Sequence, residues 1–284
     1  MGRWAREIAA LDSEADATRI VHLLGSCEFA WDIERALEFA LFRTYAVPSI
    51  SGLLAKIGAF ESDTRKRYDD TELILSEITE NGLDSDRGQA ALARMNAMHG
   101  AYRISNDDML YVLSTFVFEP ERWLDSYGKR ALTEHEKAAI WAHYRALGHA
   151  MGILEIPEDR DAFEAFNRQY EARQFAYAES NARIGAVTRD LLLSFYLPKA
   201  LIPLGRPAAH AFMDAPLLQA MGFDAAPGWL RGLLKGAMRL RAGALRLLPD
   251  RRRPHLHTRI KRPSYPRGYK IEELGTFPTR PLPK

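Results

Sequence analysis

The sequence predicts an all-α protein, and two observations support this prediction. Apolar residues recur at intervals of three and four along most of the chain, as they do in helices with one buried face. Strand-like alternation of apolar and polar residues is nearly absent. Helix boundary signals agree with the pattern: Thr133 followed by Glu136 resembles a capping box, and Asn81 followed by Gly82 is a typical helix stop. We therefore expect a single helical domain that encloses a pocket.

Periodicity and boundary signals place the expected helices in order. Pro48 ends one of them, because the residue before a proline avoids helical geometry. Ser105 begins another, which we expect to break near Pro120. No repeat of fixed period is present. The expected helices span residues 18–24, 28–45, 51–57, 64–80, 85–104, 105–118, 133–152, 159–175, 179–197, 207–221 and 228–248.

Composition narrows the classes of protein. The chain has 284 residues, of which 47% are hydrophobic, enough for one large domain. Cys27 is the single cysteine, which excludes an internal disulfide and any cysteine-based zinc or iron–sulfur site. No signal peptide is recognisable, and no uncharged apolar run approaches the roughly 18 residues of a membrane span. We expect a cytoplasmic protein in a reducing compartment.

Charge divides the chain into two parts. Residues 227–284 carry fifteen Lys and Arg against three Asp and Glu, a net charge of +12. The net charge of +2 for the whole chain leaves −10 for residues 1–226. We therefore predict a catalytic domain over 1–226 and a basic C-terminal part over 227–284 with partners of its own.

The basic C-terminal part begins with an amphipathic helix over 228–248 and continues as a proline-rich basic tail. One interpretation is peripheral contact of residues 228–262 with a membrane surface. The other is an ordinary packed helix with a solvated charged face and a tail that wraps the domain. Arg241 falls among the leucines and weakens the amphipathic pattern. The broad apolar side comprises Leu230, Leu233, Leu234, Met238, Leu240, Leu245 and Leu248, and the basic side Arg231, Lys235, Arg239 and Arg246.

Several common catalytic motifs are missing from the sequence. No phosphate-binding glycine loop, G-x-S-x-G elbow, H-E-x-x-H motif or Glu-x-x-His pair is present. Among the eight histidines, His143 is expected to be structural or to face solvent. His255 and His257 lie in the basic tail, where we expect a metal site to lack a rigid frame. Nucleic acid is not an expected partner.

Two acidic clusters are candidate magnesium sites. Asp69, Asp70 and Glu72 form one cluster, and Asp107 with Asp108 forms the other. Magnesium binds carboxylates together with phosphate oxygens, so a prenyl-diphosphate lyase is one alternative function. The spacing does not match the DDxxD motif, and a structural interpretation of Asp107 and Asp108 is that they favour the helix dipole in a first turn.

A third candidate site joins two of the expected helices. In the helix over 85–104, Leu92, Met95, Asn96, His99 and Arg103 share one face, and buried polar groups there need partners. In the helix over 64–80, one side carries a second polar group. A flat cofactor between the helices would place His99 on one of its faces and this group on the other, although a lone histidine on an apolar face is more often a satisfied core residue. The second group consists of Arg67, Asp70 and Thr71.

Longer segments resemble the MpaB oxygenase family, which is related to the rubber oxygenases (latex-clearing proteins). The similarity runs in order over residues 28–171, and R-M-N-x-x-H followed by I-S-N-D-D-x-L-Y is its most specific part. The similar segments read WDIERALEFALFRTYAVPSISGLL, KRYDDTELILSEI, ALARMNAMHGAYRISNDDMLYVLSTFVFEPERW and LTEHEKAAIWAHYRALGHAMGILEIP.

The resemblance implies an all-α fold that holds haem b, with His99 as the proximal iron ligand. Arg103 matches an arginine four residues after that ligand. The distal R-x-x-K-T motif of the rubber oxygenases corresponds to Arg67 through Thr71, with Asp70 in place of the lysine, as in the MpaB branch. Asn96 replaces their arginine three residues before the ligand. Both departures mean that the substrate handling and resting-state ligation of rubber oxygenases do not transfer directly.

These features together predict a haem b oxygenase that uses dioxygen to cleave a carbon–carbon double bond in an isoprenoid or another hydrophobic small molecule. Arg67 and Thr71 would stabilise negative charge that develops on oxygen, and Asp70 would accept or relay a proton. His99 would bind the iron, and Asn96 and Arg103 would contact the cofactor. The alternatives are the magnesium-dependent lyase and a non-catalytic haem or lipid carrier.

Overall fold

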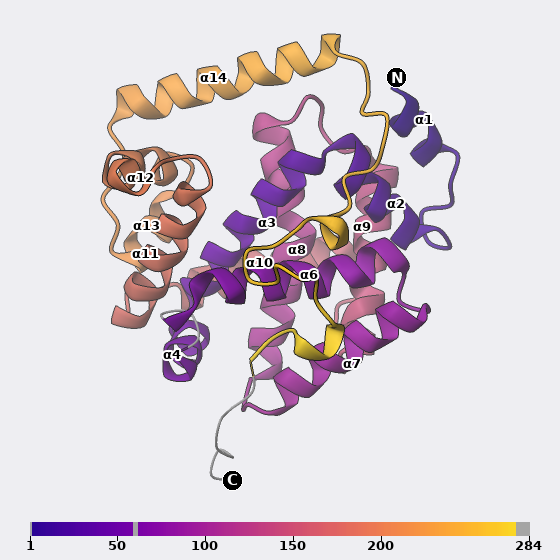
Figure 1. Ribbon diagram of the computed structural model, residues 1–284, viewed down its shortest axis with the longest axis horizontal. Helices are drawn as coiled ribbons and strands as arrows, with labels where there is room; N and C mark the ends of the chain where they lie inside the picture. Colours follow the sequence, from indigo (N-terminus) through magenta and orange to yellow (C-terminus); the bar gives the residue numbers. More distant parts are fainter. Residues whose placement is uncertain (1, 59–61, 277–284) are drawn as a thin grey trace.

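The computed structural model describes residues 2–58 and 62–276 and confirms the all-α prediction (Figure 1). Over these residues, β-structure is limited to one isolated bridge between Arg262 and Tyr265. Short 3₁₀ turns lie at His257–Arg259 and Ile271–Glu273 in the C-terminal part. The helices are α1 (Arg3–Ala9), α2 (Ala17–Leu23), α3 (Ala30–Tyr45), α4 (Pro48–Ile57), α6 (Thr64–Asn81), α7 (Asp86–Gly100), α8 (Asn106–Tyr127), α9 (Glu134–Ala150), α10 (Arg160–Gln174), α11 (Glu179–Ser194), α12 (Ile202–His210), α13 (Ala215–Met221) and α14 (Gly228–Leu247).

The core lies around α3 and α8, which pack along each other at the centre of the molecule. Ile20, Leu24, Phe29, Leu73 and Phe118 are all fully buried in it. Each such side chain contributes about 1.5–3 kcal/mol by leaving water. A smaller cluster joins α3 to α11 and α13, at the left of Figure 1. The central helices thereby form a rigid frame for α6 and α7.

Helix α8 is longer than the sequence predicts. The expected break near Pro120 is wrong, because α8 continues through this proline to Tyr127. Proline inside a helix costs about 3 kcal/mol. Phe118, Trp123 and Leu124 are buried on either side of it, and their burial offsets that cost. Tertiary packing therefore overrides the local signal.

Two further boundaries differ from expectation. The helix predicted over 207–221 is two helices, α12 and α13, and Asp214 between them caps α13 by accepting a hydrogen bond from the backbone N–H of Leu217 at 3.0 Å. Helix α1, which the sequence analysis does not predict, has seven residues and buries Trp4 and Ile8. The Trp4 indole N–H donates to the carbonyl of Arg251 at 2.7 Å, so this helix depends on a contact far along the chain.

The C-terminal tail crosses α6 and reaches α7 (Figure 1). Acidic side chains of α6 receive it: the Ser264 hydroxyl donates to Asp69 at 2.7 Å, and the Thr258 backbone N–H and hydroxyl donate to Glu80. Arg262 pairs with Glu72 at 2.5 Å. The two oppositely charged parts of the sequence are thus partners of each other. The domain boundary at 226/227 stays a prediction.

Helix α14 lies across the top of the molecule in Figure 1 and packs on α8 and α12. Arg241, the residue that interrupts the apolar pattern, faces inward. Its guanidinium pairs with Asp32 at 2.8 Å and lies over the Trp31 ring at 4.0 Å. Within the described residues, no helix is both long enough and apolar enough to cross a bilayer.

Candidate active site

A cavity of about 420 Å³ lies between α4, α6, α7 and α8. This volume is in the range of small-molecule and cofactor sites. Its walls are mostly apolar, and a few polar side chains from α6, α7 and the loop after α7 interrupt them. The apolar wall includes Leu53, Leu54, Ile74, Met95, Met98 and Val112.

His99 lines this cavity from the last turn of α7. Ser85 begins the helix by accepting a hydrogen bond from the backbone N–H of Gly88, and Leu92 and Met95 on the same face are buried. These contacts fix the face on which His99 lies. Burial, together with the positive charge of Arg67, lowers the pKa of His99 to about 4. The imidazole is therefore neutral near pH 7 and has a lone pair to offer.

Two polar atoms at the cavity have no hydrogen-bond partner among the described residues. They are Nδ1 of His99 and the hydroxyl of Tyr102, and both are buried. Buried polar atoms are nearly always paired with protein, water or a ligand. This donor set, a neutral imidazole and a phenol facing an apolar cavity, fits a bound cofactor.

Arg67 and Thr71 line the same cavity from α6. The Arg67 guanidinium donates to the Thr71 hydroxyl oxygen at 2.6 Å, and that hydroxyl donates to the Arg67 carbonyl at 3.0 Å. The predicted spacing of four residues thus gives a connected pair. Because α6 packs along α7, both residues share a cavity with His99.

Arg103 also lines the cavity, from a different kind of segment than predicted. The expected helix over 85–104 ends at Gly100, so Arg103 lies in the loop before α8 and its side chain is exposed. An exposed guanidinium at the edge of an apolar cavity is suited to an anionic group at its mouth. Four of the six predicted site residues therefore line one cavity.

Asp70 and Asn96 are the other two, and the structure places them elsewhere. Asp70 is buried and accepts hydrogen bonds from the Tyr265 hydroxyl and, at 2.7 Å, from the Lys66 ammonium. Asn96 donates to the carbonyl of Ala150 at 3.0 Å. Neither lines the cavity. The predicted proton role of Asp70 and cofactor contact of Asn96 have no geometric support, since tertiary partners orient both side chains away.

The acidic clusters proposed as magnesium sites are similarly engaged. Asp69 pairs with Arg65 at 3.0 Å and is fully buried. Asp108 accepts hydrogen bonds from the Ser49 hydroxyl at 2.8 Å and from the Tyr170 hydroxyl at 2.5 Å. These carboxylates hold helices together, which removes the geometric basis of the lyase alternative.

The sequence reasoning missed Tyr102 and the cavity position of Asp108. Tyr102 lies three residues after His99, so its spacing was a usable signal. It also missed a second cavity of about 120 Å³ that shares Thr71, Leu75 and Phe116 with the first. Glutamates from α3 and α6 line this smaller cavity, and no sequence motif indicates that they meet: Glu34, Glu38, Glu72 and Glu80.

Comparison with known proteins gives a consistent result. Residues 42–251 match the family described as the ER-bound oxygenase mpaB/B′ and rubber oxygenase catalytic domain. The chain is 32% identical over 243 residues to the ER-bound oxygenase mpaB′ of Penicillium brevicompactum. The aligned region covers 79% of this chain and 57% of that protein. It is 30% identical over 234 residues to the ER-bound oxygenase mpaB of Penicillium roqueforti, covering 76% of this chain and 78% of that protein. The chain thus spans little more than half of the first of these relatives.

Proposed function

The chain belongs to the family of mpaB and rubber oxygenase catalytic domains, and on this premise we propose that it is a haem b-dependent oxygenase acting on a carbon–carbon double bond of an isoprenoid or another hydrophobic substrate. The observation that carries the proposal is His99, a neutral imidazole with an unpartnered buried nitrogen at an apolar cavity.

In this proposal, four residues of the cavity have distinct roles. His99 would hold the cofactor through its imidazole, and the exposed Arg103 would pair with carboxylates of the cofactor at the mouth. The cofactor supplies the activation of dioxygen that side chains cannot perform. Arg67, oriented by Thr71, would stabilise negative charge that develops on oxygen, and the apolar walls would exclude water and hold the substrate chain.

The visible spectrum of the purified full-length chain tests this function. We expect a Soret band that is lost in His99→Ala, because this variant removes the imidazole that would hold the cofactor, and kept in His149→Ala, which removes an exposed histidine of α9. Product masses from a panel of isoprenoids under dioxygen then identify the reaction. A folded preparation that binds no haem contradicts the proposal, and haem binding without turnover of any alkene favours the carrier alternative.

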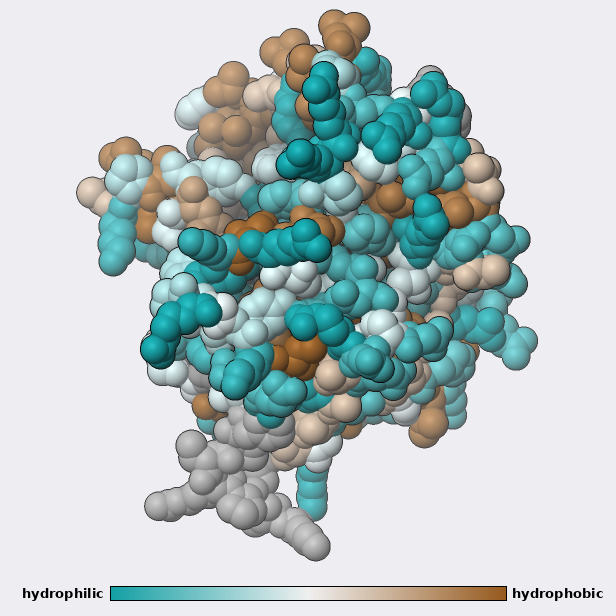
Figure 2. Space-filling model, turned by 45° about the vertical axis from the view of Figure 1, so that its right-hand side comes forward, coloured by the Kyte–Doolittle hydropathy of each residue, from teal (hydrophilic) through white to brown (hydrophobic). Residues whose placement is uncertain are grey.

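A second proposal concerns α14, whose outer surface is apolar. Trp229, Leu233, Leu240 and Leu247 are 61–88% exposed, and their spacing places them on one side of the helix. Figure 2 shows hydrophobic side chains projecting from the top of the molecule, where α14 lies. Exposed basic residues lie along another side of the helix: Arg231, Lys235, Arg239 and Arg246.

We propose that this face of α14 rests on an anionic membrane surface. Apolar side chains enter the interface while the adjacent basic side chains meet lipid headgroups. The relatives are named ER-bound oxygenases, which agrees with a membrane-associated site of action. An ordinary packed helix would bury the stripe, whereas the buried residues of α14 are Met238 and Ala242 on its other side.

Vesicle pelleting tests the membrane proposal. The full chain should pellet with phosphatidylserine-containing vesicles at low salt, and less at high salt. Lys235→Gln with Arg239→Gln should weaken binding about thirtyfold, since each basic residue contributes about 1 kcal/mol. The matched control, Arg168→Gln with Arg173→Gln, removes two exposed charges from α10 and should bind as the wild type does. Absence of binding to anionic vesicles would rule the proposal out.

A further inference from the structure

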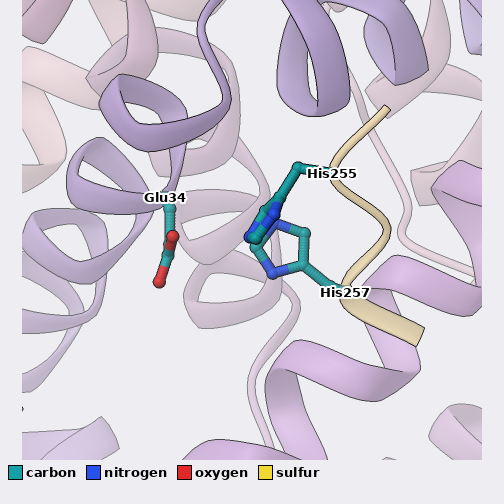
Figure 3. Close-up of side chains that lie close together, drawn as sticks. All are labelled: Glu34, His255 and His257. Carbon is teal, nitrogen blue, oxygen red and sulfur yellow. The ribbon is translucent and has the colours of Figure 1, made fainter. Parts of the chain in front are cut away.

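Three side chains outside the large cavity lie close together, with the Glu34 carboxylate across from the two imidazoles (Figure 3). Glu34 comes from α3, and His255 and His257 come from the C-terminal tail. One oxygen or nitrogen atom from each lies within 4.8 Å of the other two. Two imidazoles and a carboxylate at this separation form a common ligand set for divalent transition metals.

The tail segment that carries the two histidines is firmly held. The His255 backbone N–H donates to the carbonyl of Ser26 at 2.7 Å, and that of His257 donates to Glu80 at 2.6 Å. The Thr258 hydroxyl binds the other Glu80 oxygen. The sequence-based expectation that a metal site here would lack a rigid frame is therefore wrong, because α6 supplies the frame.

His257 is oriented as metal-binding histidines are. Its Nδ1 lies 2.6 Å from Glu72 Oε1, an ion-pair distance, which leaves Nε2 as the atom that would bind a metal. A histidine that ligates a metal through one nitrogen and gives its other N–H to a carboxylate is the usual arrangement. Arg262 fixes the second Glu72 oxygen at 2.5 Å. The carboxylate that orients His257 is thus itself held in place.

The surroundings favour a cation. Glu34, Glu72 and Glu80 line the small cavity next to His257. Arg35 also pairs with Glu34 and orients its carboxylate.

We propose that Glu34, His255 and His257 bind a divalent first-row transition-metal ion, such as Zn²⁺, that fastens the C-terminal tail to α3. Three protein ligands leave one coordination position for water. The site is separate from His99, so it goes beyond the proposed oxygenase function, and loss of one does not imply loss of the other.

Titration calorimetry on the chelator-treated full chain tests the metal site. We expect one Zn²⁺ per chain, weaker binding of Fe²⁺ under anaerobic conditions, and no stoichiometric binding of Mg²⁺, which prefers oxygen ligands. His255→Ala and Glu34→Gln should each lower the Zn²⁺ affinity at least tenfold. Glu72→Gln should lower it about 10- to 100-fold, because Glu72 positions His257. His149→Ala, an exposed histidine elsewhere, is the control and should bind Zn²⁺ normally.

A second measurement needs no variant. Zn²⁺ should slow hydrogen exchange of backbone amides over residues 255–258 in the wild-type chain, because it fixes both ligand-bearing positions. The proposal fails if the wild type shows no stoichiometric Zn²⁺ binding, if no protection appears there, or if folded His255→Ala binds Zn²⁺ as tightly as the wild type. The haem spectrum should not change in any of these variants.

Discussion

Two histidines of this chain have similarly lowered pKa values but different surroundings. Burial lowers the pKa of both His99 and His143 to about 4. His143 is buried between α9 and α2, where its Nδ1 lies 3.0 Å from the Thr18 hydroxyl. His99 faces a cavity and has no such partner. A depressed pKa alone therefore does not identify a ligand, whereas the adjoining cavity does.

The lowered pKa of His143 predicts that the folded protein loses stability in acid. Its pKa is about 4 when folded and near 6.5 when unfolded, so the unfolded state takes up the proton first. The stabilisation is complete above pH 6.5 and is lost as pH falls towards 4. His143→Gln should reduce the stability lost between about pH 7 and about pH 4.5 by about 2–3 kcal/mol, measured by urea unfolding. His149→Gln should leave the acid loss unchanged, and an unchanged loss in His143→Gln would contradict the assignment.

Helix α6 uses two of its sides for different contacts. One side gives Arg67 and Thr71 to the cavity, and the other gives Asp69, Asp70 and Glu77 to the C-terminal tail. The sequence pattern placed Asp70 with Arg67 because they are three residues apart. Asp70 pairs instead with Lys66, four residues before it, and with Tyr265. Tyr265 is 195 positions away and could not be inferred from local spacing.

The contact between Asp70 and Tyr265 predicts coupled stability effects. Tyr265→Phe should lower the free energy of unfolding by about 1–3 kcal/mol, because it leaves a buried carboxylate short of a donor. Asp70→Asn combined with Tyr265→Phe should cost less than the sum of the single variants, as measured by urea unfolding. Haem content should not change. Additive costs would contradict the coupling between Asp70 and Tyr265. A loss of turnover without a loss of stability would restore the predicted role of Asp70 in the cavity.

Local spacing explains how far the sequence could predict this molecule. The helices, the Thr133–Glu136 capping box and the shared cavity of Arg67, Thr71 and His99 follow from periodicity or from two adjacent helices. The passage of α8 through Pro120 depends on burial against other helices. The cluster of Glu34, His255 and His257 depends on the path of the tail. Neither feature has a signal within its own stretch of sequence.

At the scale of the whole molecule, the opposite charges of the two parts of the chain act within one fold. The tail covers three carboxylates of α6, and Asp69, Asp70 and Glu77 are at most 1% exposed. Each of them also pairs with a basic side chain outside the tail: Arg65, Lys66 or Arg87. Ser264, Tyr265 and Tyr269 donate to the three carboxylates. The tail therefore packs on α6 through these contacts, whereas α14 exposes apolar side chains on its outer surface.

Truncation of the chain after Leu248 tests this arrangement. The truncation removes Arg262, the partner of Glu72. Removal of one partner from a buried ionic contact costs about 3–5 kcal/mol, and a domain has only about 5–15 kcal/mol of stability in total. We expect the truncated chain to unfold at least 10 °C lower (roughly the shift for 3–4 kcal/mol in a domain of this size) or to fail to fold, as followed by circular dichroism. A truncated chain as stable as the full one would mean that the α6 carboxylates do not need the tail.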